Sequence, residues 1–321
     1  MGLLVDGVWQ EDVSRTKDGH FVRPATRFRN FVTADGSPGP TGQGGFAAEA
    51  DRYHLYISLA CPWAHRTLIF RALKQLDNVI SLSITEPLYG KTGWEFGTGT
   101  RDTANGKPTL AEIYQLADPH YTGRVSVPVL WDKKLRTIVN NESSEIIRML
   151  NSAFEAFTNA HTDYYPAALR ADIDRINDVI YPSVNNGVYR AGFATSQQAY
   201  EEAARGIFAT LDELEARLSQ QRYLVGQLIT EADWRLFTTL VRFDAVYYSH
   251  FKCNLRRIAD YPNLGNYLRE LYQVPAIAET VSIDHIKRHY YGSQPQVNPT
   301  GIVPIGPLID FTQPHDRGRF H

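Results

Sequence analysis

The spacing of hydrophobic and polar positions changes along the chain and divides it into four parts. Residues 1–49 show no sustained period and are rich in Gly, Pro, Thr and Asp, a composition typical of loops. Residues 50–155 alternate between short apolar runs and stretches with helical spacing, whereas residues 163–290 carry long amphipathic stretches. Residues 291–321 are again irregular and contain several prolines. We therefore predict two domains, preceded by an N-terminal extension and followed by a C-terminal tail.

The first domain is predicted to contain a small sheet. The expected elements are, in chain order, a strand at 53–58, a helix at 64–74, a strand at 79–84, a hairpin formed by 127–131 and 137–139, and a helix at 143–150. This order, β-α-β followed by β-β-α, favours a mixed sheet covered by helices.

The second domain is predicted to be all-helical. Over residues 199–218 the apolar side chains fall on one face, as in an amphipathic helix. Thr230 is placed as the N-cap of a further helix, with the acidic Asp233 at its third position, which is the pattern of a capping box. The predicted fold class is therefore α/β followed by all-α.

Composition and charge exclude several classes of partner. The 321 residues are 43% hydrophobic and 21% charged, and the formal charge of −2 offers no attraction to the phosphate backbone of a nucleic acid. No stretch approaches the roughly 18 apolar residues that cross a bilayer, and the N-terminus lacks the basic and apolar regions of a secretory signal. Two cysteines in 321 residues do not suit a disulfide framework, so we expect a reducing compartment, the cytoplasm.

Cys61 is the strongest candidate for chemistry. It stands between a predicted strand and a predicted helix, and Pro62 follows it at the first helical position. The positive end of a helix dipole favours a thiolate there, lowering the pKa of a free cysteine from about 8.5 toward roughly 3.5–7.5. The thiolate is the nucleophile of disulfide chemistry. A cysteine in another context is more often a buried apolar residue.

The motif lacks a second thiol, because Ala64 occupies the position that a Cys-x-x-Cys pair requires. A small-molecule thiol such as glutathione is the natural partner, forming a mixed disulfide at Cys61. Cys61 and His65 stand four residues apart and could face one metal ion, but two ligands are too few, so we expect no metal. Cys253 is distant in the chain, and we expect a structural or incidental role for it.

Two other catalytic patterns fail. Residues 90–92 end like a phosphate-binding loop, but Thr85 stands where that motif needs its first glycine. No G-x-S-x-G elbow of a serine hydrolase is present.

Three sequence features together resemble the glutathione-binding, thioredoxin-like domain of glutathione transferases: Cys61-Pro62 after a strand, Val127-Pro128 opening a hairpin and Glu142-Ser143 opening a helix. In that superfamily the proline is cis and the residue before it pairs with the cysteinyl part of glutathione, which would assign these roles to Pro128 and Val127. Glu142 and Ser143 would hold the γ-glutamyl end. The resemblance also implies a helical C-terminal domain of the glutathione transferase type.

The resemblance is closer to the glutathionyl-hydroquinone reductases, the Xi class, and it covers essentially the whole chain. It is carried by four segments, residues 58–66, 141–149, 185–189 and 298–301. By resemblance, Trp94 stacks on glutathione, Arg124 contacts it, and Tyr189 and Tyr290 line an aromatic pocket and hydrogen-bond the quinol oxygen. Ordinary packing is the alternative for the three aromatic residues, and Arg124 could equally be a solvated charge beside a hairpin.

The implied activity is the reduction of glutathionyl-hydroquinones by glutathione, with Cys61 as nucleophile and a tyrosine as proton donor. The resemblance also implies a homodimer. Two alternatives remain open: a conjugating or omega-like glutathione transferase or thiol transferase, and a binding module with the same fold but no turnover. A conjugating enzyme needs a Tyr or Ser donor to activate glutathione, so the reactive Cys61 argues against it. The intact Cys61-Pro62 and Glu142-Ser143 pairs disfavour a mere binding module.

Overall fold

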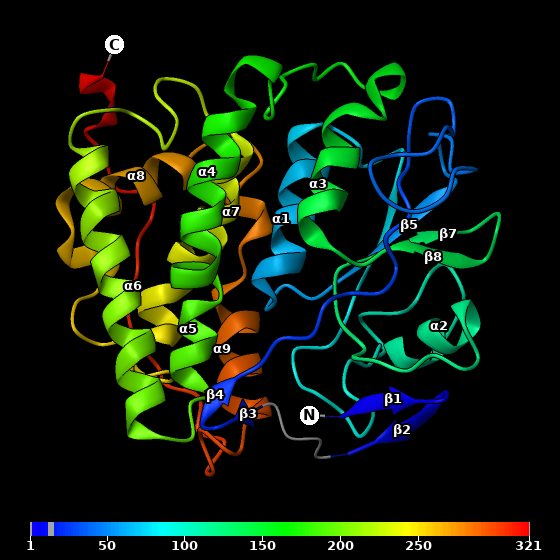
Figure 1. The fold of residues 1–321 in the computed structure, drawn as a ribbon, viewed down its shortest axis with the longest axis horizontal. Helices are drawn as coiled ribbons and strands as arrows, with labels where there is room; N and C mark the ends of the chain where they lie inside the picture. The colour runs from blue at the N-terminus through cyan, green and yellow to red at the C-terminus, as the bar shows by residue number, and fades with distance from the viewer. Residues whose placement is uncertain (1, 12–15, 321) are drawn as a thin grey trace. The chain divides into compact units, whose positions relative to one another are not determined.

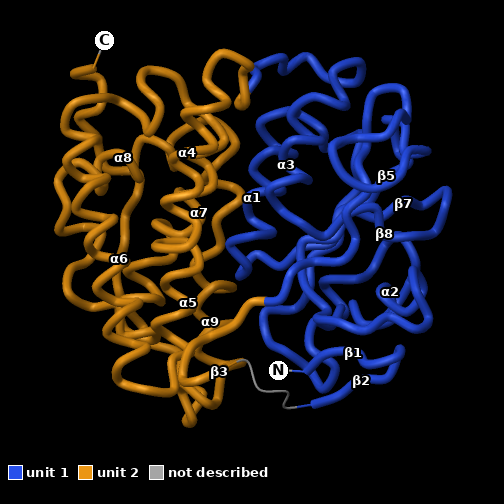
Figure 2. The backbone as a smooth tube through the Cα atoms, in the orientation of Figure 1, with its two compact units in different colours: residues 1–14, 24–163 blue, residues 15–23, 164–321 orange. Residues whose placement is uncertain are grey.

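The structure is a computed structural model that describes residues 2–11 and 16–320. Its internal contacts divide the chain after Asp163, as the two colours of Figure 2 show. The first unit holds described residues 2–11 and 24–163, and the second holds residues 16–23 and 164–320. A short N-terminal segment therefore packs with the second unit, which the spacing of apolar residues did not predict.

The first unit is built on the predicted mixed sheet. Its four strands are β5 (Tyr53–Ile57), β6 (Ser81–Ile84), β7 (Val129–Asp132) and β8 (Thr137–Asn140), arranged in the order β6-β5-β7-β8. Strands β5 and β6 run parallel, whereas β5 with β7 and β7 with β8 run antiparallel. Every residue of β5 and β7 is buried, because these central strands are covered on both faces.

Three helices cover this sheet (Figure 1). Helices α1 (Pro62–Leu73) and α3 (Ser143–Ser152) pack against each other on one face, and α2 (Leu110–Ala117) lies on the other face beside β8. Helix α2 was not among the predicted elements. Its start is marked by Thr109, whose hydroxyl accepts a hydrogen bond from the backbone N–H of Glu112 at 3.3 Å.

The N-terminal extension differs from the irregular segment that we expected. It forms two hairpins, β1 (Leu3–Val5) with β2 (Val8–Gln10) and β3 (Thr16–Lys17) with β4 (His20–Phe21). Each turns on an Asp-Gly pair with two positive φ angles, at residues 6–7 and 18–19, the conformation of the tight hairpin turn that Asp-Gly favours. The extension also adds buried side chains to the first unit: Leu4, Phe31, Val32 and Phe46.

Residues 164–320 of the second unit contain no strand in the described chain, which confirms the all-helical prediction. The helices are α4 (Arg170–Ile180), α5 (Gly187–Gly192), α6 (Gln197–Leu218), α7 (Glu231–Arg242), α8 (Pro262–Tyr272) and α9 (Ile283–Ser293). Two π-helical segments interrupt them, Tyr181–Asn185 before α5 and Phe243–Tyr247 after α7. The capping box at the start of α7 is present, because the Asp233 carboxylate accepts from the Thr230 backbone N–H at 2.8 Å. No described helix combines the length and apolar character needed to cross a bilayer.

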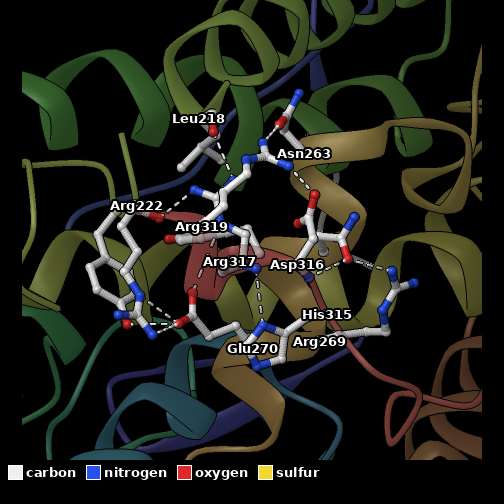
Figure 3. Close-up of polar contacts among 12 residues, drawn as sticks. Leu218, Arg222, Asn263, Arg269, Glu270, His315, Asp316, Arg317 and Arg319 are labelled. Atoms are coloured by element: carbon white, nitrogen blue, oxygen red, sulfur yellow. Dashed lines mark hydrogen bonds and ion pairs between the residues drawn. The ribbon is translucent and has the colours of Figure 1, made fainter. Parts of the chain in front are cut away.

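The C-terminal tail is irregular apart from a short 3-10 turn at Arg317–Arg319, and a buried arginine fastens it to the second unit (Figure 3). The Arg317 side chain is fully buried and donates to the carbonyl oxygens of Leu218 and Gln221, each at 2.7 Å. Its Nε lies 3.9 Å from Glu270 Oε2. The carbonyl of Leu218 is the last of α6, so Arg317 caps that helix with a cation, which suits the negative end of the helix dipole.

Candidate functional site

Cys61 lies where strand β5 leads into helix α1. It is the N-cap residue, with extended backbone angles (φ −77°, ψ 120°), and Pro62 is the first helical residue, as the motif predicts. The Cys61 carbonyl accepts the first helical hydrogen bond from His65 at 2.9 Å, while its side chain caps no backbone group. The side chain is partly exposed. The sulfur is therefore accessible at the positive end of a helix dipole, which favours its thiolate form.

The loop that precedes β7 approaches this sulfur. The Val127–Pro128 peptide bond is cis, as the resemblance implies, and the Val127 carbonyl lies 3.5 Å from Cys61 Sγ. Tyr114, buried in α2, donates to the Ser126 carbonyl at 2.8 Å and accepts from the Asn141 amide at 3.0 Å. The Tyr114 hydroxyl thus links the loop before Pro128 to Asn141, the residue that precedes Glu142.

Glu142 and Ser143 begin helix α3. Glu142 is the N-cap, and its carboxylate accepts from the backbone N–H and the hydroxyl of Ser144 at 3.2 and 3.1 Å. Ser143 is the first helical residue and is buried. A helix N-terminus with a serine at this position presents donors to an anion. These two residues are suited to hold a carboxylate and an amine, the groups of a γ-glutamyl end.

Trp94 and Arg124 also belong to the first unit. Trp94 is buried, and its ring packs edge-on against that of Tyr89 with centroids 4.5 Å apart. Arg124 is partly buried and donates to the Gly2 carbonyl at 3.1 Å, so it holds the first hairpin. Arg124 is therefore not simply a solvated charge beside a hairpin, which was the alternative that the sequence allowed. Contact of either residue with glutathione remains a prediction.

Tyr189 and Tyr290 meet in the second unit, although 101 positions separate them in the chain. Their hydroxyl oxygens lie 2.6 Å apart. Tyr189 lies in α5, which follows the first π-helical segment, and Tyr290 lies in α9. Burial, with the neighbouring tyrosines, raises the pKa of Tyr290 well above its usual value, so this phenol keeps its proton. A buried, protonated phenol can act as a hydrogen-bond donor or a general acid.

A third phenol, Tyr247, was not predicted. Its hydroxyl lies 3.1 Å from that of Tyr290, and it ends the second π-helical segment. Phe251 packs against Tyr189 with ring centroids 5.6 Å apart. A Cβ on Gly192 would lie 2.2 Å from the Phe251 ring, so helix α5 can lie this close to Phe251 only with glycine at position 192. We call Tyr189, Tyr247 and Tyr290 the tyrosine cluster. No local pattern distinguishes Tyr247 among the 18 tyrosines of the sequence.

The other candidates for thiol or metal chemistry are less suited. Cys253 is fully buried, and burial raises the pKa of its thiol far above the usual range, so it is not a nucleophile at neutral pH. Within the described residues no group of three or more His, Cys, Asp or Glu side chains is placed to hold a metal ion. The chemistry of the first unit therefore centres on Cys61.

Comparison with known proteins agrees with this geometry. Residues 60–153 match the model of the glutathione S-transferase N-terminal domain, and residues 197–270 match that of the C-terminal domain. The chain is 58% identical to glutathionyl-hydroquinone reductase YqjG of Escherichia coli K12, covering 99% of this chain and 98% of that protein. It is 54% identical to glutathionyl-hydroquinone reductase PcpF of Sphingobium chlorophenolicum, covering 96% of each.

Solved structures support the same assignment. The glutathione-bound structure of YqjG matches with a TM-score of 0.93 at 56% identity, over 99% of this chain and 100% of that one. A Xi class glutathione transferase from Natrialba magadii matches with a TM-score of 0.92 at 47% identity, over 100% of this chain and 97% of that one. This chain belongs to the glutathionyl-hydroquinone reductases, the Xi class of the glutathione transferase superfamily.

Proposed function

We propose that this chain reduces glutathionyl-hydroquinones to hydroquinones with glutathione as co-substrate. The observation that carries the proposal is the accessible Cys61 thiol at the N-cap of α1, beside the carbonyl that precedes cis-Pro128. This geometry suits thiolate attack on sulfur, and it occurs in a chain whose relatives are named for that reaction. Glu142, Ser143, Val127, Trp94 and Arg124 bind glutathione in this proposal.

The reaction proceeds in two exchanges. The Cys61 thiolate attacks the glutathione sulfur of the substrate, an S–S bond forms, and the bond between that sulfur and the ring carbon breaks. The electron pair of the broken bond stays on the ring carbon, which takes up a proton and becomes that of the free hydroquinone. A second glutathione thiolate then attacks the mixed disulfide, which releases oxidised glutathione and restores the Cys61 thiolate. Two glutathione sulfurs are oxidised, and the ring carbon is reduced.

The leaving carbon requires a proton donor, because an aryl carbanion is a poor leaving group. We assign the proton to the tyrosine cluster, where Tyr290 is held protonated and is hydrogen-bonded to Tyr189. The same hydroxyls are suited to hydrogen-bond a quinol oxygen. Tyr189 and Tyr290 are thus the catalytic phenols of this proposal.

Replacement of the nucleophile tests the proposal. Cys61→Ser removes the thiolate and is expected to abolish hydroquinone release from glutathionyl-menadiol. Cys253→Ser is the matched control, since that thiol is buried and un-ionised. Release that survives in Cys61→Ser would refute the scheme. A conjugating transferase would instead form the glutathione adduct of chlorodinitrobenzene without Cys61, and a binding module would bind glutathione and turn over neither substrate.

We further propose a homodimer in the cytoplasm. Three apolar side chains of the tail, Ile302, Ile305 and Leu308, are 69%, 93% and 96% exposed, and exposed apolar groups of this kind favour association. Both cysteines are free thiols, which suits a reducing compartment. Light scattering is expected to give twice the chain mass for the wild type, and Ile305→Asp with Leu308→Asp is expected to weaken association. A monomeric wild type would contradict the dimer.

A further inference from the structure

Helix α1 carries a buried cation, Arg66, whose side chain reaches the start of helix α3. Arg66 is 1% exposed, and its Nη1 lies 3.3 Å from the hydroxyl oxygen of Ser143. Its guanidinium also lies over the ring of Trp63, with Cζ 4.5 Å from the ring centroid. Burying a guanidinium is costly unless its surroundings or a ligand compensate for the lost hydration. Through its contact with Ser143, Arg66 joins the helix that begins beside Cys61 to the N-terminus of α3.

The direction of this hydrogen bond has a chemical consequence. An arginine can only donate, so Ser143 Oγ must accept. The proton of the serine hydroxyl then has to point elsewhere, and in the described part of the chain Arg66 is the only hydrogen-bond partner of that hydroxyl. The neighbouring Glu142 carboxylate is engaged by Ser144 at 3.2 Å. The Ser143 hydroxyl is thus left with a proton to donate, at the N-terminus of α3.

We infer that Arg66 is a positioning residue for glutathione. It fixes the Ser143 hydroxyl as a donor toward the α-carboxylate of the γ-glutamyl group, and it places a positive charge behind that carboxylate. This inference rests on the proposed glutathione site. In a site with little water, a fixed donor and a nearby charge strengthen the bond to a carboxylate more than they would in solution.

Only a ligand that bears the α-carboxylate senses Arg66, so replacing Arg66 should weaken the binding of such ligands selectively. The probes are glutathione and its decarboxylated analogue, 4-aminobutanoyl-cysteinylglycine, with dissociation constants measured by calorimetry under reducing conditions. Arg66→Met keeps the length of the side chain and removes both the donor and the charge. It is expected to weaken glutathione binding about tenfold, the usual size of one hydrogen bond to a charged group, and to leave binding of the analogue within about twofold.

Two further variants separate this role from a structural one. Ser143→Ala is expected to reduce the preference for glutathione over the analogue, and adding Arg66→Met to it is expected to cause a smaller loss than Arg66→Met causes in the wild type. Arg71→Met is the matched control, since Arg71 lies in the same helix but bonds the Ile80 carbonyl and Asp77. It is expected to bind both peptides like the wild type.

Several results would overturn the inference. If Arg66→Met weakens the binding of both peptides equally, or of neither, then Arg66 has only a packing role. If the losses of glutathione affinity in Ser143→Ala and Arg66→Met add up in the double variant, then Arg66 does not act through Ser143. If Arg66→Met does not fold, Arg66→Lys provides the test, because lysine retains a donor and a positive charge. Arg66→Lys is expected to keep the preference for glutathione over the decarboxylated analogue. Equal binding of both peptides by Arg66→Lys would refute the inference. A wild type that binds neither peptide would instead refute the proposed function.

Discussion

Removal of the Tyr290 hydroxyl tests whether the tyrosine cluster acts in catalysis. This hydroxyl lies between two others, 2.6 Å from that of Tyr189 and 3.1 Å from that of Tyr247. Tyr290→Phe therefore removes two buried hydrogen bonds and leaves both partners without this neighbour. At about 1 kcal/mol for each net hydrogen bond, we expect the free energy of unfolding to fall by about 2 kcal/mol.

The effect on turnover is expected to be larger than this loss of stability would cause. A positioned general acid contributes about 10²- to 10⁴-fold, so hydroquinone release by Tyr290→Phe should fall by at least about 100-fold while the fold persists. Burial raises the pKa of Tyr290 well above its usual value. Deprotonation of this phenol should therefore not reduce the wild-type rate between pH 7 and 10.

The assay is steady-state release of menadiol from glutathionyl-menadiol, with unfolding in urea measured in parallel. Tyr291→Phe is the matched control, because Tyr291 is the next residue of α9, is also buried, and bonds Ser249 and the Ala245 carbonyl outside the cluster. It should lose stability on a similar scale and keep its turnover. If Tyr290→Phe loses stability but retains wild-type turnover, the cluster is structural and its assignment as proton donor is wrong.

Two further predictions concern stability. Arg317→Met breaks the buried contacts that hold the tail to Leu218 and Glu270, and it should lower the free energy of unfolding by about 3 kcal/mol. Arg319→Met is the control, because this side chain is exposed, and it should change the free energy of unfolding by less than about 0.5 kcal/mol. Similar urea midpoints for the two variants would contradict the anchoring role of Arg317. His54 is buried between Ser81 and Ser83, and burial lowers its pKa to about 4. Because the unfolded state takes up this proton near pH 6.5 and the folded state only near pH 4, the contribution of His54 to stability is present above pH 6.5 and is lost as the pH falls, by about 2 kcal/mol at pH 5. His54→Gln should remove this part of the acid sensitivity, and an unchanged difference between pH 7.5 and pH 5 would show that other groups cause it.

The sequence was informative for several elements whose structure follows local rules. Apolar periodicity located the strands and helices around Cys61, and the Thr230 capping box appears as expected, because both signals lie within a few neighbouring residues. The Asp-Gly pairs at residues 6–7 and 18–19 were an available signal for the two N-terminal hairpins. They were outweighed by the loop-like composition of the segment that contains them.

Other missed features depend on contacts between distant residues. Tyr247 joins Tyr290 across 43 positions, and Arg66 meets Ser143 across 77, so no spacing in the sequence connects either pair. The same holds for Arg317, whose burial depends on the tail returning to the end of α6. Family resemblance supplied Tyr189 and Tyr290, but it named them singly, whereas the structure shows them hydrogen-bonded to each other.

The most direct measurement of the central claim is mass spectrometry of the intact protein mixed with glutathionyl-menadiol in the absence of free glutathione. We expect one glutathione to be added to Cys61 for each menadiol released, no adduct on Cys253, and loss of the adduct when glutathione is supplied. Release of menadiol by a protein that never carries the adduct, or an adduct that glutathione cannot remove, would contradict the mixed-disulfide mechanism.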